Sequence, residues 1–86
     1  MAVLTVSIVS AESEVFSGEA KLVVARTVEG EMGVMPGHEP VLAILAPGDV
    51  RVTLPDGQSL TAHANSGFLS VENNTVTVVA QRAELV

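Results

Sequence analysis

The chain has 86 residues, 48% of them apolar, and its ten acidic and four basic residues give a net charge of −6. This composition predicts one compact domain over residues 1–86 and excludes a disordered chain. The negative charge repels phosphate backbones, and Phe16 and Phe68 are the only aromatic residues, so we expect no nucleic acid as a partner. The absence of cysteine excludes disulfides, thiolate metal sites and thiol nucleophiles. No stretch approaches the roughly 20 apolar residues that span a bilayer, so we expect a soluble chain that meets a membrane only through partners.

The first part of the sequence predicts short strands. Residues Val3–Ser10 alternate apolar and polar side chains, with the two-residue period of a half-buried strand. Glu12–Glu14 predicts a polar turn. The segments Val15–Gly18 and Ala20–Arg26 predict two further strands, with a bulge or break between them at Gly18.

The middle of the sequence changes character. Residues Val28–Pro40 include three glycines and two prolines, which predicts a bent, turn-rich segment with at most about two strand residues. We expect the glycines to shape this loop through positive φ angles. The apolar run Val41–Ala46 follows and predicts a short buried strand, closed by Pro47-Gly48.

Two hairpins are predicted in the second half. Asp49–Leu54 and Ser59–Ala64 are joined by a Pro-Asp-Gly step, in which proline presets the first turn residue and glycine supplies the positive φ that follows. Phe68–Val71 and Thr75–Ala80 are joined by a turn with two consecutive asparagines, which tolerate the left-handed conformation of a tight turn.

Short strands separated by turn residues, with no helical periodicity before the last five residues, predict an all-β fold. We expect an antiparallel sandwich or small barrel made by one domain. Its core is expected to include the inward-facing apolar residues of these strands, namely Leu4, Val6, Ile8, Val52, Phe68, Val76 and Val78.

We find no catalytic, metal-binding or cofactor-binding motif. The glycine-rich segment Gly30–Gly37 is followed by neither a lysine nor a helix, and nearby glutamates would repel a phosphate, so no nucleotide is expected. His38 and His63 are the only histidines, too few for a metal site without cysteine. We interpret His63 as an ordinary strand residue, whereas His38 either holds its loop by hydrogen bonds or faces a partner. Ser66 lacks the sequence context of a catalytic nucleophile and is interpreted as a turn residue.

The glycine-rich loop is instead typical of an interaction surface. Met32, Val34 and Met35 are apolar and can hardly all face the core, and methionine adapts well to binding surfaces. Two other functions remain open on these residues alone. One is a generic β-sandwich adaptor. The other is a small hydrolase or isomerase that uses Glu29, Glu31 and His38, which requires these side chains to converge in a pocket.

Three segments of the sequence resemble a known family. The loop Thr27–Leu42 resembles the signature of the F-type ATP synthase epsilon subunit. The segments Val9–Glu12 and Phe16–Gly18 resemble the start of that family, and Ser66–Val71 resembles its late Gly-Gly-Phe-Leu-x-Val strand. The resemblance extends over essentially the whole chain, in order.

The resemblance implies a flattened antiparallel β-sandwich of about ten short strands. It also implies a non-catalytic rotor subunit, seated on the gamma subunit and on the polar loops of the c-ring, that helps couple proton flow to ATP synthesis. Its place would be peripheral, at the cytoplasmic face of the cell membrane. In the family, the loop matching Glu29–His38 is directed to the c-ring and gamma. The residues carried over as partner contacts are Glu29, Glu31, Met32, Val34, Met35 and His38.

The sequence departs from the family pattern in two places. Ser66 stands where the family usually has the first of two glycines. Typical members also continue past the position of Glu84 into a two-helix hairpin that restrains hydrolysis and, in some members, binds ATP, whereas this sequence ends at Val86. The sequence fits either a naturally short member or the amino-terminal part of a longer one, and in both cases we assign neither hairpin-dependent inhibition nor nucleotide binding.

Overall fold

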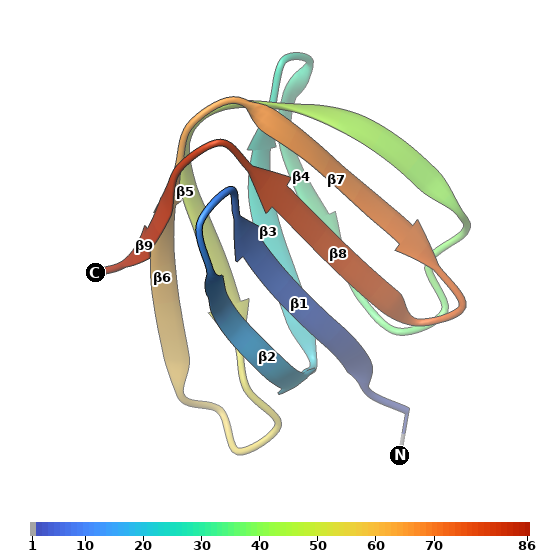
Figure 1. Ribbon diagram of the computed structural model, residues 1–86. Helices are drawn as coiled ribbons and strands as arrows, with labels where there is room; N and C mark the ends of the chain where they lie inside the picture. Colours follow the sequence, from blue (N-terminus) through green and yellow to red (C-terminus); the bar gives the residue numbers. More distant parts are fainter. Residues whose placement is uncertain (1) are drawn as a thin grey trace.

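The computed structural model describes residues 2–86 and shows nine β-strands in that range (Figure 1). In chain order the strands are β1 (Leu4–Ser10), β2 (Glu14–Ala20), β3 (Leu22–Thr27), β4 (Gly30–Val34), β5 (Val41–Thr53), β6 (Ser59–Ala64), β7 (Gly67–Glu72), β8 (Thr75–Ala80) and β9 (Ala83–Leu85). The all-β prediction is therefore confirmed.

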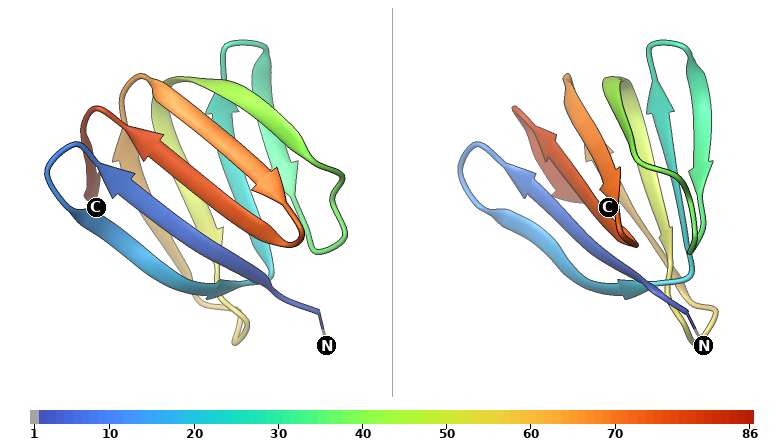
Figure 2. Two further views of the ribbon diagram at one scale, coloured as in Figure 1. Left: turned by 45° about the vertical axis from the view of Figure 1, so that its right-hand side comes forward. Right: turned by 90° about the vertical axis from the view of Figure 1, so that its right-hand side faces the viewer.

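The strands form one hydrogen-bonded sheet that folds over into two layers. The order along the sheet is β2-β1-β8-β7-β5-β3-β4, while β6 pairs with β5 and β9 pairs with β6. Figure 2 shows β1, β2, β7 and β8 in one layer facing β3, β4 and β6 in the other. The strand pairs are antiparallel as expected, with one exception, because β1 and β8 run parallel. Strands so far apart in sequence need no tight hairpin to join them, so either direction is open to them.

Strand β5 joins the two layers. Its first half, Val41–Leu45, pairs with β7, and its second half, Gly48–Thr53, pairs with β6. The sequence predicted two strands separated at Pro47-Gly48, but the structure has one bent strand that changes partner at this step. Proline cannot donate a ladder hydrogen bond, so such a change of partner is a suitable place for it.

Both predicted hairpins are confirmed. Gly57, in the turn between β5 and β6, has a φ of 94°. Asn73 and Asn74 lie between β7 and β8 with φ values of 50° and 60°. These positive φ angles explain why glycine and asparagine occupy the turns.

Two further local predictions were wrong. Gly18 lies within β2, and the break before β3 comes at Lys21 instead. The glycine-rich segment contains the five-residue strand β4, because Gly30–Val34 pairs in register with Val23–Thr27. The last residues form β9, which pairs with β6.

The core lies between the two layers and consists of aliphatic residues from every strand except β9. Alternate residues of β1 and β8, such as Val6 and Val76, are fully buried as predicted. Phe68 was assigned to the core wrongly, since 40% of it is exposed. Its neighbour Leu69 is fully buried, and successive strand residues point to opposite faces, so Phe68 faces outward.

Candidate partner-docking surface

The six predicted contact residues do not form a single loop in the structure. Glu29 lies in the turn between β3 and β4, and Glu31 and Met32 lie in the first half of β4. Met35 and His38 lie in the β4–β5 loop (residues 35–40), at the far end of β4. Strand β4 therefore separates the predicted contacts into two groups.

Val34 belongs to the core, with no part of it exposed. Its side chain cannot be offered to a partner by the folded domain, so we correct its assignment to a contact surface. The physical reason is the strand geometry of β4, which turns Val34 inward opposite Val23. Met32 also packs against the core and is only partly exposed, whereas 62% of Met35 is exposed.

The tip of the β3–β4 hairpin, which projects at the top of Figure 1, is a rigid turn. The buried Thr27 hydroxyl donates to the carbonyl oxygen of Gly30 at 2.8 Å and accepts from the amide of Glu29 at 3.2 Å. Gly30 has a φ of 124°, which a residue with a side chain rarely adopts. These contacts hold Glu29 and Glu31 at the surface, where both are exposed.

An open hollow of ≈ 520 Å³ lies between this tip and the first half of β5. Exposed apolar residues line it, namely Val28, Leu42 and Ile44, together with the partly buried Met32. Glu29 and Glu31 are also part of its lining. The hollow thus combines apolar walls with carboxylates, an arrangement suited to an apolar side chain next to a basic or polar group.

A continuous line of apolar residues crosses the outer face of one layer. Adjacent members of this line are cross-strand neighbours or, at its last step, joined by a backbone hydrogen bond from Val28 to Ile44. We call it the apolar row, and it consists of Val9, Val79, Phe68, Ile44 and Val28. Its exposure grows along the row, from partial at Val9 and Val79 to 57% at Ile44 and 63% at Val28.

A second row runs beside the apolar row and carries no charge. It consists of Ser7, Thr77, Ser70 and Leu42, again direct neighbours across β1, β8, β7 and β5. Leu42 is 70% exposed. Together the two rows make an uncharged part of the outer face on a protein whose net charge is −6. Depletion of charge and enrichment of apolar side chains are typical of the centre of a protein interface.

The sequence did not predict four apolar residues at the surface, namely Val28, Leu42, Ile44 and Phe68. The run Val41–Ala46 is apolar at every position, and such a run ordinarily indicates a strand buried on both faces. The structure buries Leu45 but leaves Leu42 and Ile44 exposed. An apolar strand at the outside of a small sandwich is the signal that could have indicated a docking face.

The loop carrying Met35 and His38 contains two local hydrogen bonds. The amide of His38 donates to the carbonyl oxygen of Met35 at 3.1 Å, and His38 Nδ1 donates to the carbonyl oxygen of Glu39 at 2.7 Å. This agrees with the interpretation that His38 holds its loop. Because β4 separates it from Glu29 and Glu31, the three side chains do not converge, and the hydrolase or isomerase hypothesis lacks the pocket it needs.

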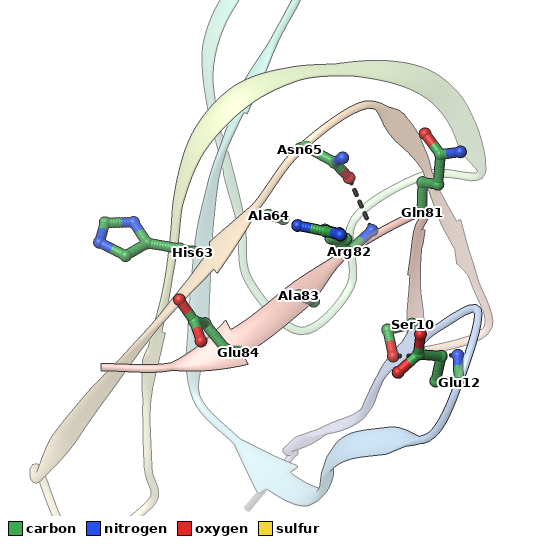
Figure 3. Close-up of a pocket in the computed structure, with 9 residues that line it drawn as sticks. All are labelled: Ser10, Glu12, His63, Ala64, Asn65, Gln81, Arg82, Ala83 and Glu84. Carbon is green, nitrogen blue, oxygen red and sulfur yellow. Dashed lines mark hydrogen bonds between the residues drawn. The ribbon is translucent and has the colours of Figure 1, made fainter.

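A second hollow, of ≈ 440 Å³, lies where the chain passes from β8 to β9 (Figure 3). Asn65 ties its two walls together, since Asn65 Oδ1 accepts from the amide of Arg82 at 2.7 Å and the amide of Asn65 donates to the Arg82 carbonyl at 3.1 Å. Glu12, His63 and Glu84 also line it. Charges of both signs are spread around this open hollow without a common focus, so it offers no recognisable ligand chemistry.

Two exposed side-chain pairs involve residues of β5. Arg51 lies 3.4 Å from Glu31, and His63 pairs with Asp49 on the neighbouring strand. Within residues 2–86 no three histidine, aspartate or glutamate side chains are grouped to hold a metal ion. The same part of the chain contains no helix that could cross a membrane.

Comparison with known proteins decides the family. Residues 3–86 match the model of the β-sandwich domain of the ATP synthase delta/epsilon chain. The chain belongs to this family. The ATP synthase epsilon chain of Micrococcus luteus is 49% identical over 85 residues, which cover 99% of this chain and 93% of that protein. The epsilon chain of Rhodococcus opacus is 51% identical over 86 residues, but the match covers only 70% of that longer protein.

Solved structures agree with this assignment. A chain of the Euglena gracilis mitochondrial ATP synthase, in a structure of OSCP, F1 and c-ring, superimposes with a TM-score of 0.92 at 26% identity, covering 99% of this chain and 54% of that one. A chain of the Tetrahymena thermophila central stalk and c-ring has the same fold, with a TM-score of 0.77 at 16% identity. The epsilon chain of an ATP synthase is a regulatory or structural subunit and not the catalytic one.

Proposed function

We propose that this domain is a docking part of the ATP synthase central stalk, which binds the gamma subunit and the c-ring and helps couple proton flow to ATP synthesis. It does so at the cytoplasmic face of the membrane, held there by its partners. The observation that carries this proposal is the uncharged outer face formed by the apolar row and the adjoining row from Ser7 to Leu42.

Contact between water and the exposed apolar residues of this face is unfavourable in free energy, and a bound partner would remove that contact. Ile44 is 57% exposed and Leu42 70% exposed, and each Å² of apolar surface taken out of water contributes roughly 25 cal/mol. All residues of the two rows except Val28 lie on β-strands, so little conformational entropy is lost on binding. A folded subunit with an apolar surface of its own, such as gamma, is the partner that this face fits.

The hairpin tip supplies a different kind of contact. Glu29 and Glu31 are exposed beside the hollow, and carboxylates at the rim of an interface set its register and association rate. Polar or basic loops, as on the c-ring, are the complementary surface. The related Euglena chain comes from an assembly that includes F1 and the c-ring, which supports a place for this domain in such an assembly.

A single added charge tests the proposal. Ile44→Asp places a carboxylate in the apolar row, and Gln58→Asp adds the same charge in the exposed β5–β6 turn, outside both rows. Truncating or charging the centre of an interface commonly costs more than about 1.4 kcal/mol, or tenfold in affinity. We expect Ile44→Asp to weaken binding to a purified gamma–c-ring complex at least tenfold, and Gln58→Asp to bind as the wild type does. Equal binding by all three proteins, with circular dichroism showing that each is folded, would show that the outer face is not the docking surface.

A further inference from the structure

Asn74 joins three segments of the chain. Its Oδ1 accepts a hydrogen bond from the amide of Gly37 at 2.7 Å, and its carbonyl oxygen accepts from the amide of Thr5 at 2.8 Å. It lies in the β7–β8 turn with a φ of 60°. One residue therefore connects this turn to the start of β1 and to the middle of the β4–β5 loop.

The β4–β5 loop has little else to fix its direction. Between the ends of β4 and β5 its internal backbone bond runs from the His38 amide to the Met35 carbonyl. That bond closes the turn but does not attach it to the sheet. Gly37 is exposed and has a φ of 90°, and its amide is bound by Asn74. The Asn74 side chain thus supplies the hydrogen bond that links the middle of the loop to another part of the sandwich.

The neighbouring residue shows that the turn alone does not explain Asn74. Asn73 also has a positive φ, of 50°, but is exposed, whereas Asn74 is partly buried. Glycine satisfies a positive φ at either position. Only position 74 needs, in addition, a side-chain acceptor that reaches Gly37.

We propose that Asn74 is a positioning residue for partner binding, which holds the β4–β5 loop so that Met35 and the loop backbone meet the partner in a fixed direction. This inference rests on the proposed function. A loop that is already ordered loses little conformational entropy on binding. A domain whose loop is free should therefore bind more weakly, even though its contact residues are unchanged.

Two glycine substitutions separate the hydrogen bond from the turn. Asn74→Gly keeps the left-handed backbone and the carbonyl that Thr5 binds, and removes only the acceptor for Gly37. Asn73→Gly makes the same change of residue where no side-chain bond is lost. Asn74→Asp restores an acceptor, because a carboxylate oxygen also accepts from a backbone amide.

The first measurement is amide hydrogen exchange and the proton chemical shift of Gly37 by NMR on the whole chain. We expect Gly37 in Asn74→Gly to exchange about tenfold faster and to shift upfield, since its hydrogen bond is lost. We expect Asn73→Gly and Asn74→Asp to resemble the wild type. A Gly37 amide that is unchanged in Asn74→Gly would overturn the inference.

The second measurement is affinity for the gamma–c-ring complex. We expect Asn74→Gly to bind about three- to tenfold more weakly, corresponding to one ordered segment, and Asn74→Asp to recover most of the loss. If Gly37 is released but Asn74→Gly binds as tightly as the wild type, while Ile44→Asp does not bind, the positioning role is wrong and the docking function stands. If neither variant changes binding, the positioning role is wrong and the outer face is not the docking surface.

Discussion

Replacing Gly67 by alanine should destabilise the domain strongly, because the first residue of β7 has no room for a side chain. A Cβ built on Gly67 would lie 1.9 Å from the carbonyl oxygen of Val79 and 2.7 Å from the Cα of Ala80. Both atoms belong to the backbone of β8, so no side-chain rotation relieves the overlap. Gly67 is the direct partner of Ala80 in the β7–β8 ladder.

The size of the effect follows from the movement required. Ordinary carbon contacts begin near 3.5 Å, so the two backbones must separate by about 1 Å or more at the point where β7 starts. Overpacking a well-formed core by much less costs roughly 1–3 kcal/mol. We therefore expect Gly67→Ala to lower the free energy of unfolding by about 3 kcal/mol. A domain of this length has roughly 4–13 kcal/mol in total.

Urea unfolding followed by circular dichroism measures this change, and Gly33→Ala is the matched control. Gly33 lies in β4 without a positive φ, and a Cβ there would meet nothing within 4 Å. The control should be neutral or more stable than the wild type by up to about 1 kcal/mol, because glycine loses more chain entropy on folding than alanine. If Gly67→Ala unfolds within about 0.5 kcal/mol of the wild type, the close approach of β7 and β8 is not real.

Two further predictions use the same unfolding assay. Leu69→Ala should lower the free energy of unfolding by about 2–5 kcal/mol, because Leu69 is fully buried. Phe68→Ala should lower it by less than about 2 kcal/mol, because 40% of Phe68 is exposed. A larger decrease for Phe68→Ala would show that Phe68 belongs to the core. Glu31→Gln removes the ion pair in which Glu31 lies 3.4 Å from Arg51. The side chain of Glu31 is 66% exposed and that of Arg51 is 55% exposed, so the free energy of unfolding should change by less than about 0.5 kcal/mol. The same variant should reduce the salt dependence of binding to the c-ring, and an unchanged salt dependence would place Glu31 outside the interface.

The sequence alone determined the fold class and most of the turns. The alternation in Val3–Ser10 and Thr75–Ala80 predicted strands with one buried face, and the structure buries Val6 and Val76 as expected. The turn residues Gly57, Asn73 and Asn74 predicted hairpins, because few residues tolerate positive φ angles. These are local properties, so they can be recognised in a short stretch of sequence.

The tertiary structure alone decided which apolar residues are exposed. Val34 and Leu42 are both aliphatic and lie close together in sequence, yet Val34 is fully buried and Leu42 is 70% exposed. Burial depends on which layer lies over a strand face, and that is set by pairings between residues far apart in the chain, such as β1 with β8 and β5 with β7. The apolar row exists because five segments each place one apolar residue next to that of the neighbouring segment. This alignment depends on the register between strands, so no pattern within a single segment predicts it.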